Sequence, residues 1–503
     1  MIQNIVANFI GKFWSILSNF LFVPLYIHYL GFDSFSIISF TLVIASFMAV
    51  IDAGLTATLS REFARDDNCG AEKIRIFKTL ESSYFILIGL SITLVYAISG
   101  TIANNWLNLS SFDANRISFF LKIMSFDIGF QLLLRFYMGG LLGLEKHIKA
   151  NMYQVGWGIL RNGIVIFAII IFPTLEMFFL WQTFSTIIFS ILVGLSLKKE
   201  LSGHYKFDFS FKIEKSVFKK IWRFAGGMLL ISLVASLNTQ MDKLVISKLL
   251  PIASLGYYTL AVSLSMGITV FVSPISIALL PRFTALYSTG KKSEASLLFH
   301  KINLFVSIIV FTMTAIMAIF AKELLWIWTG NLELAENASI YLPIIAVSTA
   351  MLSIATIPYN IAIANGYTKL NNLLGLFSLL ITLPGYWIAT KYFGAIGAAY
   401  LFCGVQTGTT LIYLYIISIK FINSDKMSEL YIHGIFFPLA ISLCFALGFS
   451  FTPEWAEQNR LYALIWIGMA TLVTFLASFF LLFPKNDVKR ILLVVSTNDK
   501  KII

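Results

Sequence analysis

Residues 7–20 read ANFIGKFWSILSNF, an apolar stretch that carries Asn8, Lys12, Ser15 and Asn19 at intervals of four, three and four. An α-helix with about 3.6 residues per turn places these four polar side chains on one stripe. The stretch therefore predicts a helix with one wet side. The surroundings of the other side distinguish a soluble amphipathic helix from a helix in a membrane.

The composition of the chain indicates a membrane. Of its 503 residues, 58% are hydrophobic and only 12% are charged. Soluble domains carry about 25% charged residues, so we expect an integral membrane protein. The first apolar run lacks a basic start and a cleavage site, which favours a retained helix over a signal peptide. Cys69, Cys403 and Cys444 have no disulfide or metal-ligand spacing, and we expect neither a metal site nor a cofactor.

Apolar segments of roughly 20 residues, the length that crosses a hydrocarbon core of about 30 Å, recur along the chain. They predict an all-α polytopic membrane protein with about fourteen transmembrane helices. The expected spans are 5–29, 35–59, 81–103, 119–142, 152–172, 176–197, 225–249, 257–280, 302–320, 338–363, 372–391, 395–418, 431–451 and 461–483.

The Lys and Arg residues provide a test of these spans, because cytoplasmic loops carry an excess of positive charge. When the connections alternate between two sides, 27 of the 37 Lys and Arg residues fall on one side and five on the other. This asymmetry predicts that both termini are cytoplasmic and that the number of spans is even. It also explains the net charge of +12 without a nucleic-acid partner.

A sequence repeat relates two halves of the chain. LSREFA at 59–64 recurs as LPRFTA at 280–285, and LEKHIKANM at 144–152 recurs more weakly as NGYTKLNNL at 365–373. With six helices per copy, both copies start on the same side, which predicts lobes related by an axis along the membrane normal. The expected parts are a six-helix lobe at 1–200, a basic cytoplasmic linker at 201–224, a second six-helix lobe at 225–420, and two extra helices with a cytoplasmic tail at 421–503.

Eight charged residues lie inside the expected spans, at least three residues from either end. An ion in hydrocarbon costs roughly 2.5–3.5 kcal/mol on insertion scales, so these residues need a partner or water. Five are basic and three are acidic, which predicts an interior that prefers anions, and phosphate oxygens suit such fixed cations. The eight residues are Lys12, Asp52, Lys122, Asp127, Arg135, Arg161, Asp242 and Lys243.

The depth and spacing of these charges separate the candidates. Arg161 lies near the membrane midplane and shares a helix face with Gln154, so we favour a functional role for it. In the fourth span Asp127, Gln131 and Arg135 lie at i, i+4 and i+8 and form either the wall of a cavity or a self-neutralising network.

Lysine side chains near helix ends can instead snorkel to the headgroups. We favour snorkelling for Lys122 and Lys243, and we leave it as the alternative to an anion-facing role for Lys12. Asp52 and Asp242 are open between an ion site and a structural role, such as an ion pair between Asp242 and Lys243.

Four stretches of the chain resemble the multidrug/oligosaccharidyl-lipid/polysaccharide exporter superfamily, in particular its Wzx-type flippases. They cover the first two helices of each half, and as a set they are fairly specific to the polysaccharide exporters. The stretches are PLYIHYLGFDSFSI at 24–37, VIDAGLTATLSREFAR at 50–65, NTQMDKLVISKLLPIASLGYYTLA at 238–261 and PISIALLPRFTALYSTG at 274–290.

The resemblance implies two lobes around a central cavity, two additional C-terminal helices and alternating access. It also implies a substrate, an undecaprenyl-pyrophosphate-linked oligosaccharide repeat unit that moves from the inner to the outer leaflet of a bacterial cytoplasmic membrane. The repeat unit is implied to belong to an O-antigen of lipopolysaccharide, a capsule or a related surface polysaccharide. Membrane lipids are expected partners, and a polysaccharide polymerase and a chain-length regulator are candidate partners.

The expected roles of the intramembrane polar residues are inferred from their own charge and position, since the functional residues of the family vary between its members. For ion coupling the candidates are Asp52, Asp127 and Asp242. For binding the substrate, with the cations holding its pyrophosphate head, the candidates are Lys12, Arg135, Arg161, Asn8, Asn19, Gln131 and Gln154.

Two other functions remain open. A multidrug or cation antiporter of the same superfamily predicts a cavity dominated by acidic residues, and the three intramembrane aspartates keep this alternative in play. A membrane-embedded glycan polymerase predicts a sizeable outer loop with catalytic side chains, whereas the expected outer connections are short. The chain has no G-x-x-x-x-G-K-[ST] motif for ATP, and we expect a transporter without enzymatic activity.

Overall fold

The computed structural model describes residues 18, 20–65, 70–109, 112–202, 213–422 and 430–483. Nearly all of these residues lie in helices, and their β-pairing is limited to an isolated parallel bridge between Asn108 and Pro251. The chain divides into two compact units. Unit 1 comprises Met1–Gly256 with Leu383–Ala395, and unit 2 comprises Tyr257–Thr382 with Ile396–Ile503.

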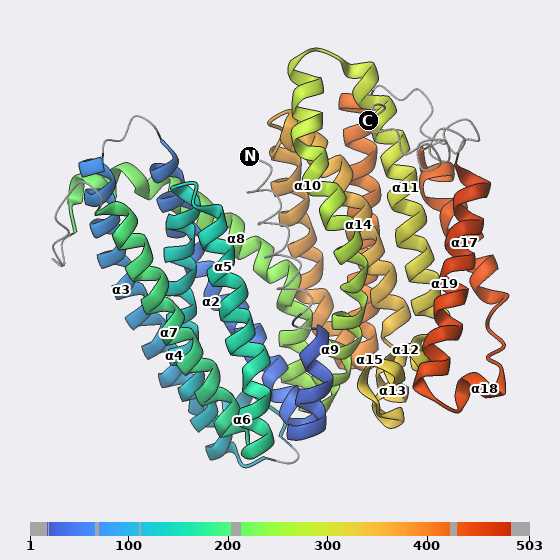
Figure 1. The fold of residues 1–503 in the computed structure, drawn as a ribbon, viewed down its shortest axis with the longest axis horizontal. Helices are drawn as coiled ribbons and strands as arrows, with labels where there is room; N and C mark the ends of the chain where they lie inside the picture. The colour runs from blue at the N-terminus through green and yellow to red at the C-terminus, as the bar shows by residue number, and fades with distance from the viewer. Residues whose placement is uncertain are drawn as a thin grey trace. The chain divides into compact units, whose positions relative to one another are not determined.

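Unit 1 contains the helices of the first half of the chain, and several run side by side in Figure 1. They are Phe20–Leu30, α2 (Phe32–Ala64), α3 (Gly70–Thr101), the π-helix η1 (Ile102–Trp106), α4 (Ala114–Gly143), α5 (His147–Gly158), the π-helix η2 (Ile159–Ile164), α6 (Val165–Ile171), α7 (Leu175–Leu201) and α8 (Lys215–Leu249).

Unit 2 contains most of the second half, and α9 (Ile252–Ser265) begins in unit 1 and continues into unit 2. Its other helices are α10 (Gly267–Ser288), α11 (Lys292–Ile319), α12 (Ala321–Thr329), α13 (Leu332–Ser339), α14 (Leu342–Ala364), α15 (Lys369–Ile417), η3 (Ser418–Ile422), η4 (Ile432–Phe436), α17 (Phe437–Leu447), α18 (Glu454–Glu457) and α19 (Arg460–Leu482).

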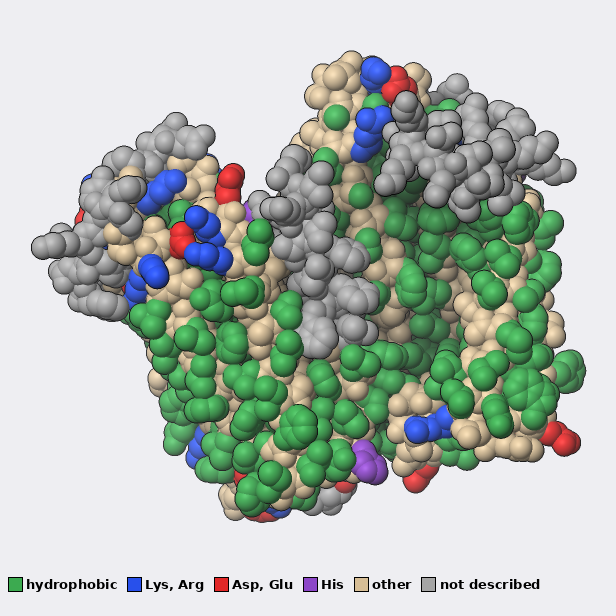
Figure 2. Space-filling model, in the orientation of Figure 1, with side chains coloured by type: hydrophobic (Ala, Val, Ile, Leu, Met, Phe, Trp, Pro, Cys, Tyr) green, Lys and Arg blue, Asp and Glu red, His purple; other side chains and the backbone are tan. Residues whose placement is uncertain are grey.

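The helices fit a membrane in length and composition. Eleven helical stretches of the described chain are long and apolar enough to cross a bilayer. Each expected span overlaps a described helix, and α15 holds two of the spans, because Gly394 with a φ of 66° makes a turn within it. Hydrophobic side chains form a broad band over the middle of each unit (Figure 2). The chain is therefore an all-α polytopic membrane protein, as predicted.

The eighth expected span differs from the structure. The sequence predicted one helix over 257–280, but α9 ends at Ser265 and α10 begins at Gly267. Apolar residues continue across this break, so hydropathy alone does not locate it. The Ser265 hydroxyl lies 3.1 Å from the Thr349 hydroxyl of α14, a contact that depends on tertiary packing.

Helix α8 packs along α2 and belongs to unit 1. Near its C-terminal end the Trp106 Nε1–H donates to the Ser247 hydroxyl over 3.1 Å. The sequence placed this helix in the second lobe after a linker at 201–224, whereas α8 already begins at Lys215 and the compact units separate after Gly256. The lobe boundaries derived from the sequence repeat remain a prediction, because the compact units follow contacts and not the repeat.

The two C-terminal spans pack on α11 of unit 2. The Ser442 hydroxyl of α17 lies 3.4 Å from that of Thr312 and 3.2 Å from that of Ser478. Buried Ala446 and Ala470 join this seam, and such small residues allow close helix contact in membranes.

The core of unit 1 is built around α4, which packs against α2, α3 and α7. The Phe136 ring lies between those of Tyr84 and Phe77, with centroid separations of 4.4 and 6.1 Å. Close approach to α2 requires a glycine, because a Cβ added at Gly143 would lie 2.6 Å from the Ser60 carbonyl oxygen.

This close approach predicts that Gly143→Ala destabilises unit 1. Overpacking against a backbone atom costs about 1–3 kcal/mol. The matched control is Gly89→Ala on α3, because a Cβ at Gly89 meets no atom within 4 Å. Thermal unfolding of the purified protein in detergent should show a lower midpoint for Gly143→Ala and an unchanged or slightly higher one for Gly89→Ala. Equal midpoints for the two variants would contradict this account of the α2–α4 contact.

Candidate functional site

The fifth span contains at its centre the π-helix η2, which includes Arg161. Three consecutive carbonyl oxygens of this π-helix accept hydrogen bonds from side chains of other helices. Trp181 Nε1 donates to the Leu160 oxygen over 2.9 Å, Gln182 Nε2 donates to the Arg161 oxygen over 2.9 Å, and the Tyr26 hydroxyl donates to the Asn162 oxygen over 2.8 Å. Irregular backbone in a membrane needs such partners, and π-helices and broken helices often mark functional sites.

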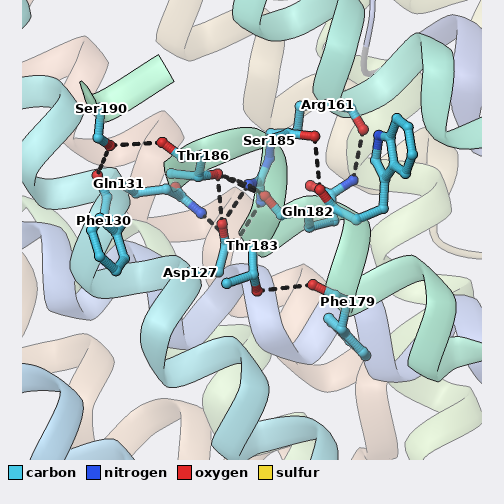
Figure 3. Close-up of polar contacts among 11 residues, drawn as sticks. Asp127, Phe130, Gln131, Arg161, Phe179, Gln182, Thr183, Ser185, Thr186 and Ser190 are labelled. Carbon is cyan, nitrogen blue, oxygen red and sulfur yellow. Dashed lines mark hydrogen bonds and ion pairs between the residues drawn. The ribbon is translucent and has the colours of Figure 1, made fainter. Parts of the chain in front are cut away.

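Arg161 forms a two-pronged ion pair with Asp127 of α4 (Figure 3). Its Nη1 donates to Asp127 Oδ1 over 2.6 Å and its Nη2 donates to Oδ2 over 2.8 Å. The side chains are 12% and 6% exposed, so the pair is nearly enclosed. Pairing with Asp127 lowers the free-energy cost of placing the Arg161 guanidinium group in the middle of a membrane-spanning helix.

Asp127 accepts two further hydrogen bonds. Gln131 Nε2, one turn along α4, donates to Oδ2 over 2.8 Å, and the Thr186 hydroxyl of α7 lies 2.7 Å from Oδ1. Thr186 also accepts a hydrogen bond from Arg161 Nη1 over 2.6 Å. Four donors therefore surround the Asp127 carboxylate.

Arg135 does not join this network. It lies two turns beyond Asp127 on α4, its side chain is exposed, and it is close enough to Asp52 of α2 for their charges to interact. Of the three residues in the i, i+4, i+8 series, the structure joins Asp127 to Gln131 and leaves Arg135 apart. The fourth span was expected to form either the wall of a cavity or a self-neutralising network, and in the structure Asp127 is neutralised by Arg161 of the fifth span.

Asp52 lies buried between α2, α3 and α4. It accepts hydrogen bonds from the hydroxyls of Thr56 and Tyr84, and the Tyr84 hydroxyl also lies 3.0 Å from the Leu132 carbonyl oxygen. Arg135 lies within electrostatic range of this carboxyl group.

Asp242 of α8 is also buried. The Nζ atom of Lys243 lies 3.9 Å from its Oδ1, and Tyr386 of α15 lies within electrostatic range of it. Lys243 donates to the Thr239 carbonyl oxygen over 3.2 Å, a contact along its own helix. The other predicted snorkelling residue, Lys122, places its Nζ 5.2 Å from the centre of the Tyr96 ring. Whether either lysine reaches a membrane surface remains a prediction.

The remaining predicted residues are less informative. Asn8, Lys12 and Asn19 lie outside the described residues. Gln154 is half-buried on α5. Within the described part of the chain, no group of three or more His, Cys, Asp and Glu side chains is arranged to hold a metal ion.

The sequence analysis missed a second nearly buried ion pair, between Glu81 and Lys198. Lys198 Nζ lies 2.8 Å from Glu81 Oε1, the Tyr137 hydroxyl donates to the same oxygen over 2.6 Å, and the side chains of Lys198 and Glu81 are 14% and 10% exposed. The sequence placed Lys198 in a cytoplasmic loop and Glu81 at the first residue of a span. A carboxylate and a lysine at the ends of two expected spans, on the side predicted to be cytoplasmic, were the signal available.

We expect this pair to stabilise the contact between α3 and α7 in unit 1. Glu81→Gln should lower the free energy of unfolding by about 3 kcal/mol, because it leaves the Lys198 ammonium group without its carboxylate. The double variant Glu81→Gln with Lys198→Met should recover most of that loss. Chemical or thermal unfolding in detergent provides the measurement, and a single variant as stable as the wild type would contradict this role.

The chain is similar in sequence to two protein families and to a named transporter. The family model described as polysaccharide biosynthesis protein matches residues 1–287, and the MatE model matches residues 228–388. A Shigella flexneri protein with the provisional name O-antigen transporter is 21% identical over 373 residues, which cover 74% of this chain and 86% of that protein.

Two solved structures show a similar fold. A structure titled as the lipid II flippase MurJ in an inward closed conformation matches with a TM-score of 0.72 and 16% identity, over 95% of this chain and 98% of that one. An inward-facing multidrug resistance MATE family transporter of the MOP superfamily matches with a TM-score of 0.65 and 14% identity, over 83% of this chain and 96% of that one. At these identities the likeness concerns the fold alone.

Proposed function

The chain belongs to the polysaccharide biosynthesis protein family, and from this premise we propose that it is a flippase for a lipid-linked oligosaccharide. Its substrate is a repeat unit of a surface polysaccharide, carried on undecaprenyl pyrophosphate, which moves to the outer leaflet of a bacterial cytoplasmic membrane. The relative named as an O-antigen transporter and the fold shared with a lipid II flippase support this proposal. The exporter superfamily expected from the sequence agrees with these matches.

The observation that carries the proposal is the pair of guanidinium groups inside the membrane-spanning part of unit 1. Arg135 is exposed, and Arg161 lies in the π-helix η2 of the fifth span. A pyrophosphate head group carries several negative oxygens, and arginine is well suited to bind them because its planar fork matches their geometry. Both residues lie within the part of the chain that the family model matches.

The expected topology gives the two arginines an order along the transport path. Cytoplasmic termini place the end of α4 near Gly143 on the inner side, so Arg135 lies closer to the cytoplasm than Asp127 and its partner Arg161. We propose that the head group meets Arg135 first and Arg161 later. Lys12, with Asn8 and Asn19 on the same stripe, completes the proposed cationic entrance.

The coupling ion is proposed to act at Asp52 or Asp242, since a buried carboxylate in a membrane is a candidate proton or cation site. Asp127 is the third carboxylate of this set, but its four donors favour a different role for it. Alternating access between the two sides of the membrane is proposed to couple ion movement to substrate movement.

A multidrug or cation antiporter is the second candidate function. The MatE match over residues 228–388 and the fold shared with a MATE transporter favour it, and the buried Asp242 would then hold a cationic substrate. The glycan polymerase gains no support, because the matched proteins are named as transporters or flippases.

We predict that Arg135→Gln lowers surface polysaccharide at least tenfold in a strain that lacks its own flippase, because the head group loses its first cation. The lipid-linked precursor should accumulate in the inner leaflet at the same time. Lys122→Gln is the matched control, since it removes a cation from the outer part of the same helix and should export normally. Variant protein in the membrane is quantified by immunoblot.

Two outcomes would overturn this assignment. Normal export by Arg135→Gln at normal protein level would exclude Arg135 from the substrate path. Unchanged export together with a lost resistance to cationic drugs, whether in this variant or in Asp242→Asn, would favour the antiporter instead.

A further inference from the structure

We propose that Asp127 and Thr186 are positioning residues, which hold Arg161 by one edge so that its other edge is presented to a phosphate group of the substrate. This inference rests on the proposed function and deepens it. It assigns Asp127 a role other than ion coupling, and it assigns the ligand to particular atoms of Arg161.

The guanidinium group of an arginine has five N–H donors. Asp127 takes the two that point outward along the side chain, one from Nη1 and one from Nη2. Thr186 takes the second Nη1–H over 2.6 Å. The second Nη2–H and the Nε–H remain, and neither of them donates a hydrogen bond within the described residues.

These two remaining donors form one edge of the planar group. They point in nearly the same direction, so they match two oxygens of a phosphate in the side-on bidentate arrangement. The end-on edge, which would otherwise compete for the same ligand, is already occupied by Asp127. A phosphate therefore does not have to displace the carboxylate to reach Arg161.

The orientation of this edge is fixed from three directions. Gln182 of α7 donates to the Arg161 carbonyl oxygen over 2.9 Å, which anchors the backbone at the π-helix. Thr186, one turn along α7, contacts both Nη1 and Asp127 Oδ1. The Trp157 ring centre lies 5.2 Å from Arg161 Cζ and limits rotation of the guanidinium plane. A flexible arginine loses conformational entropy on binding, and this one has already lost it.

The charge balance supports the same assignment. Without a ligand, the Arg161–Asp127 pair is neutral, which suits a site that is nearly enclosed. A ligand with several negative oxygens gains two charge-assisted hydrogen bonds there without leaving an unpaired cation behind when it departs. The pair thus allows a cation-based site to exist at this depth in both the loaded and the empty state.

The test measures binding to the full-length protein purified in detergent, with farnesyl pyrophosphate as the probe and farnesol as its uncharged counterpart. Thr186→Val removes the hydroxyl that holds Nη1, and we expect about a fivefold or greater loss of affinity for the pyrophosphate probe. Thr186→Ser keeps the hydroxyl and should restore binding. Ser190→Ala is the matched control, because its hydroxyl lies one turn further along α7 and contacts only the Phe130 and Thr186 carbonyl oxygens.

Arg161→Lys separates the edge from the charge. Lysine keeps the positive charge but lacks the planar fork, so it should bind the pyrophosphate probe more weakly than the wild type while remaining folded. If Thr186→Val unfolds, the comparison of Thr186→Ser with Thr186→Ala in the same titration decides the same question.

The outcomes separate this inference from the proposed function. If Thr186→Val and Arg161→Lys bind like the wild type while Arg135→Gln loses binding, the positioning role is wrong and the flippase assignment stands. If the wild type binds farnesol as tightly as farnesyl pyrophosphate, both the phosphate site and the inference fail.

Discussion

An arginine near the middle of a bilayer has to be neutralised, and the Arg161–Asp127 pair meets this requirement. The pair joins α4 to the π-helix η2 of the fifth span. Thr186 and Gln182 of α7 hydrogen-bond to Arg161 of the same π-helix. Because ions without partners are so unfavourable in hydrocarbon, the pair fixes the relative placement of three helices of unit 1. Side chains of α7 and of the helix Phe20–Leu30 then satisfy the carbonyl groups of the π-helix η2.

Unit 1 contains a second arginine, Arg135, whose charge is less completely neutralised than that of Arg161. Arg135 is exposed and shares only a longer-range interaction with Asp52, whereas Arg161 is paired atom by atom. An exposed cation with a loose partner can exchange that partner for an anionic ligand at little cost. A cation held in a fixed geometry gives directional recognition instead. The two arginines thus offer different kinds of contact along one proposed path.

The helices of this fold were predictable from the sequence because apolar runs of roughly 20 residues indicate membrane-spanning helices without any knowledge of tertiary contacts. The charged candidates were predictable for the same reason, since Arg161 and Asp127 interrupt such runs. Their pairing was not, because the partner of Asp127 comes from another helix, and only packing decides between Arg135 and Arg161. The Glu81–Lys198 pair and the break between α9 and α10 escaped prediction because both depend on contacts between helices distant in sequence.

The central claim is that the Arg161–Asp127 pair serves the substrate as well as the fold. The most direct measurement compares the wild type with the double variant Arg161→Gln and Asp127→Asn in proteoliposomes that contain a fluorescent undecaprenyl-pyrophosphate-linked oligosaccharide. The double variant removes both charges together and so leaves no unpaired buried ion, and the fold should survive. The account predicts that transbilayer movement of the lipid falls to the level of protein-free liposomes. Movement at the wild-type rate by a folded double variant would contradict it and leave the pair a purely structural element.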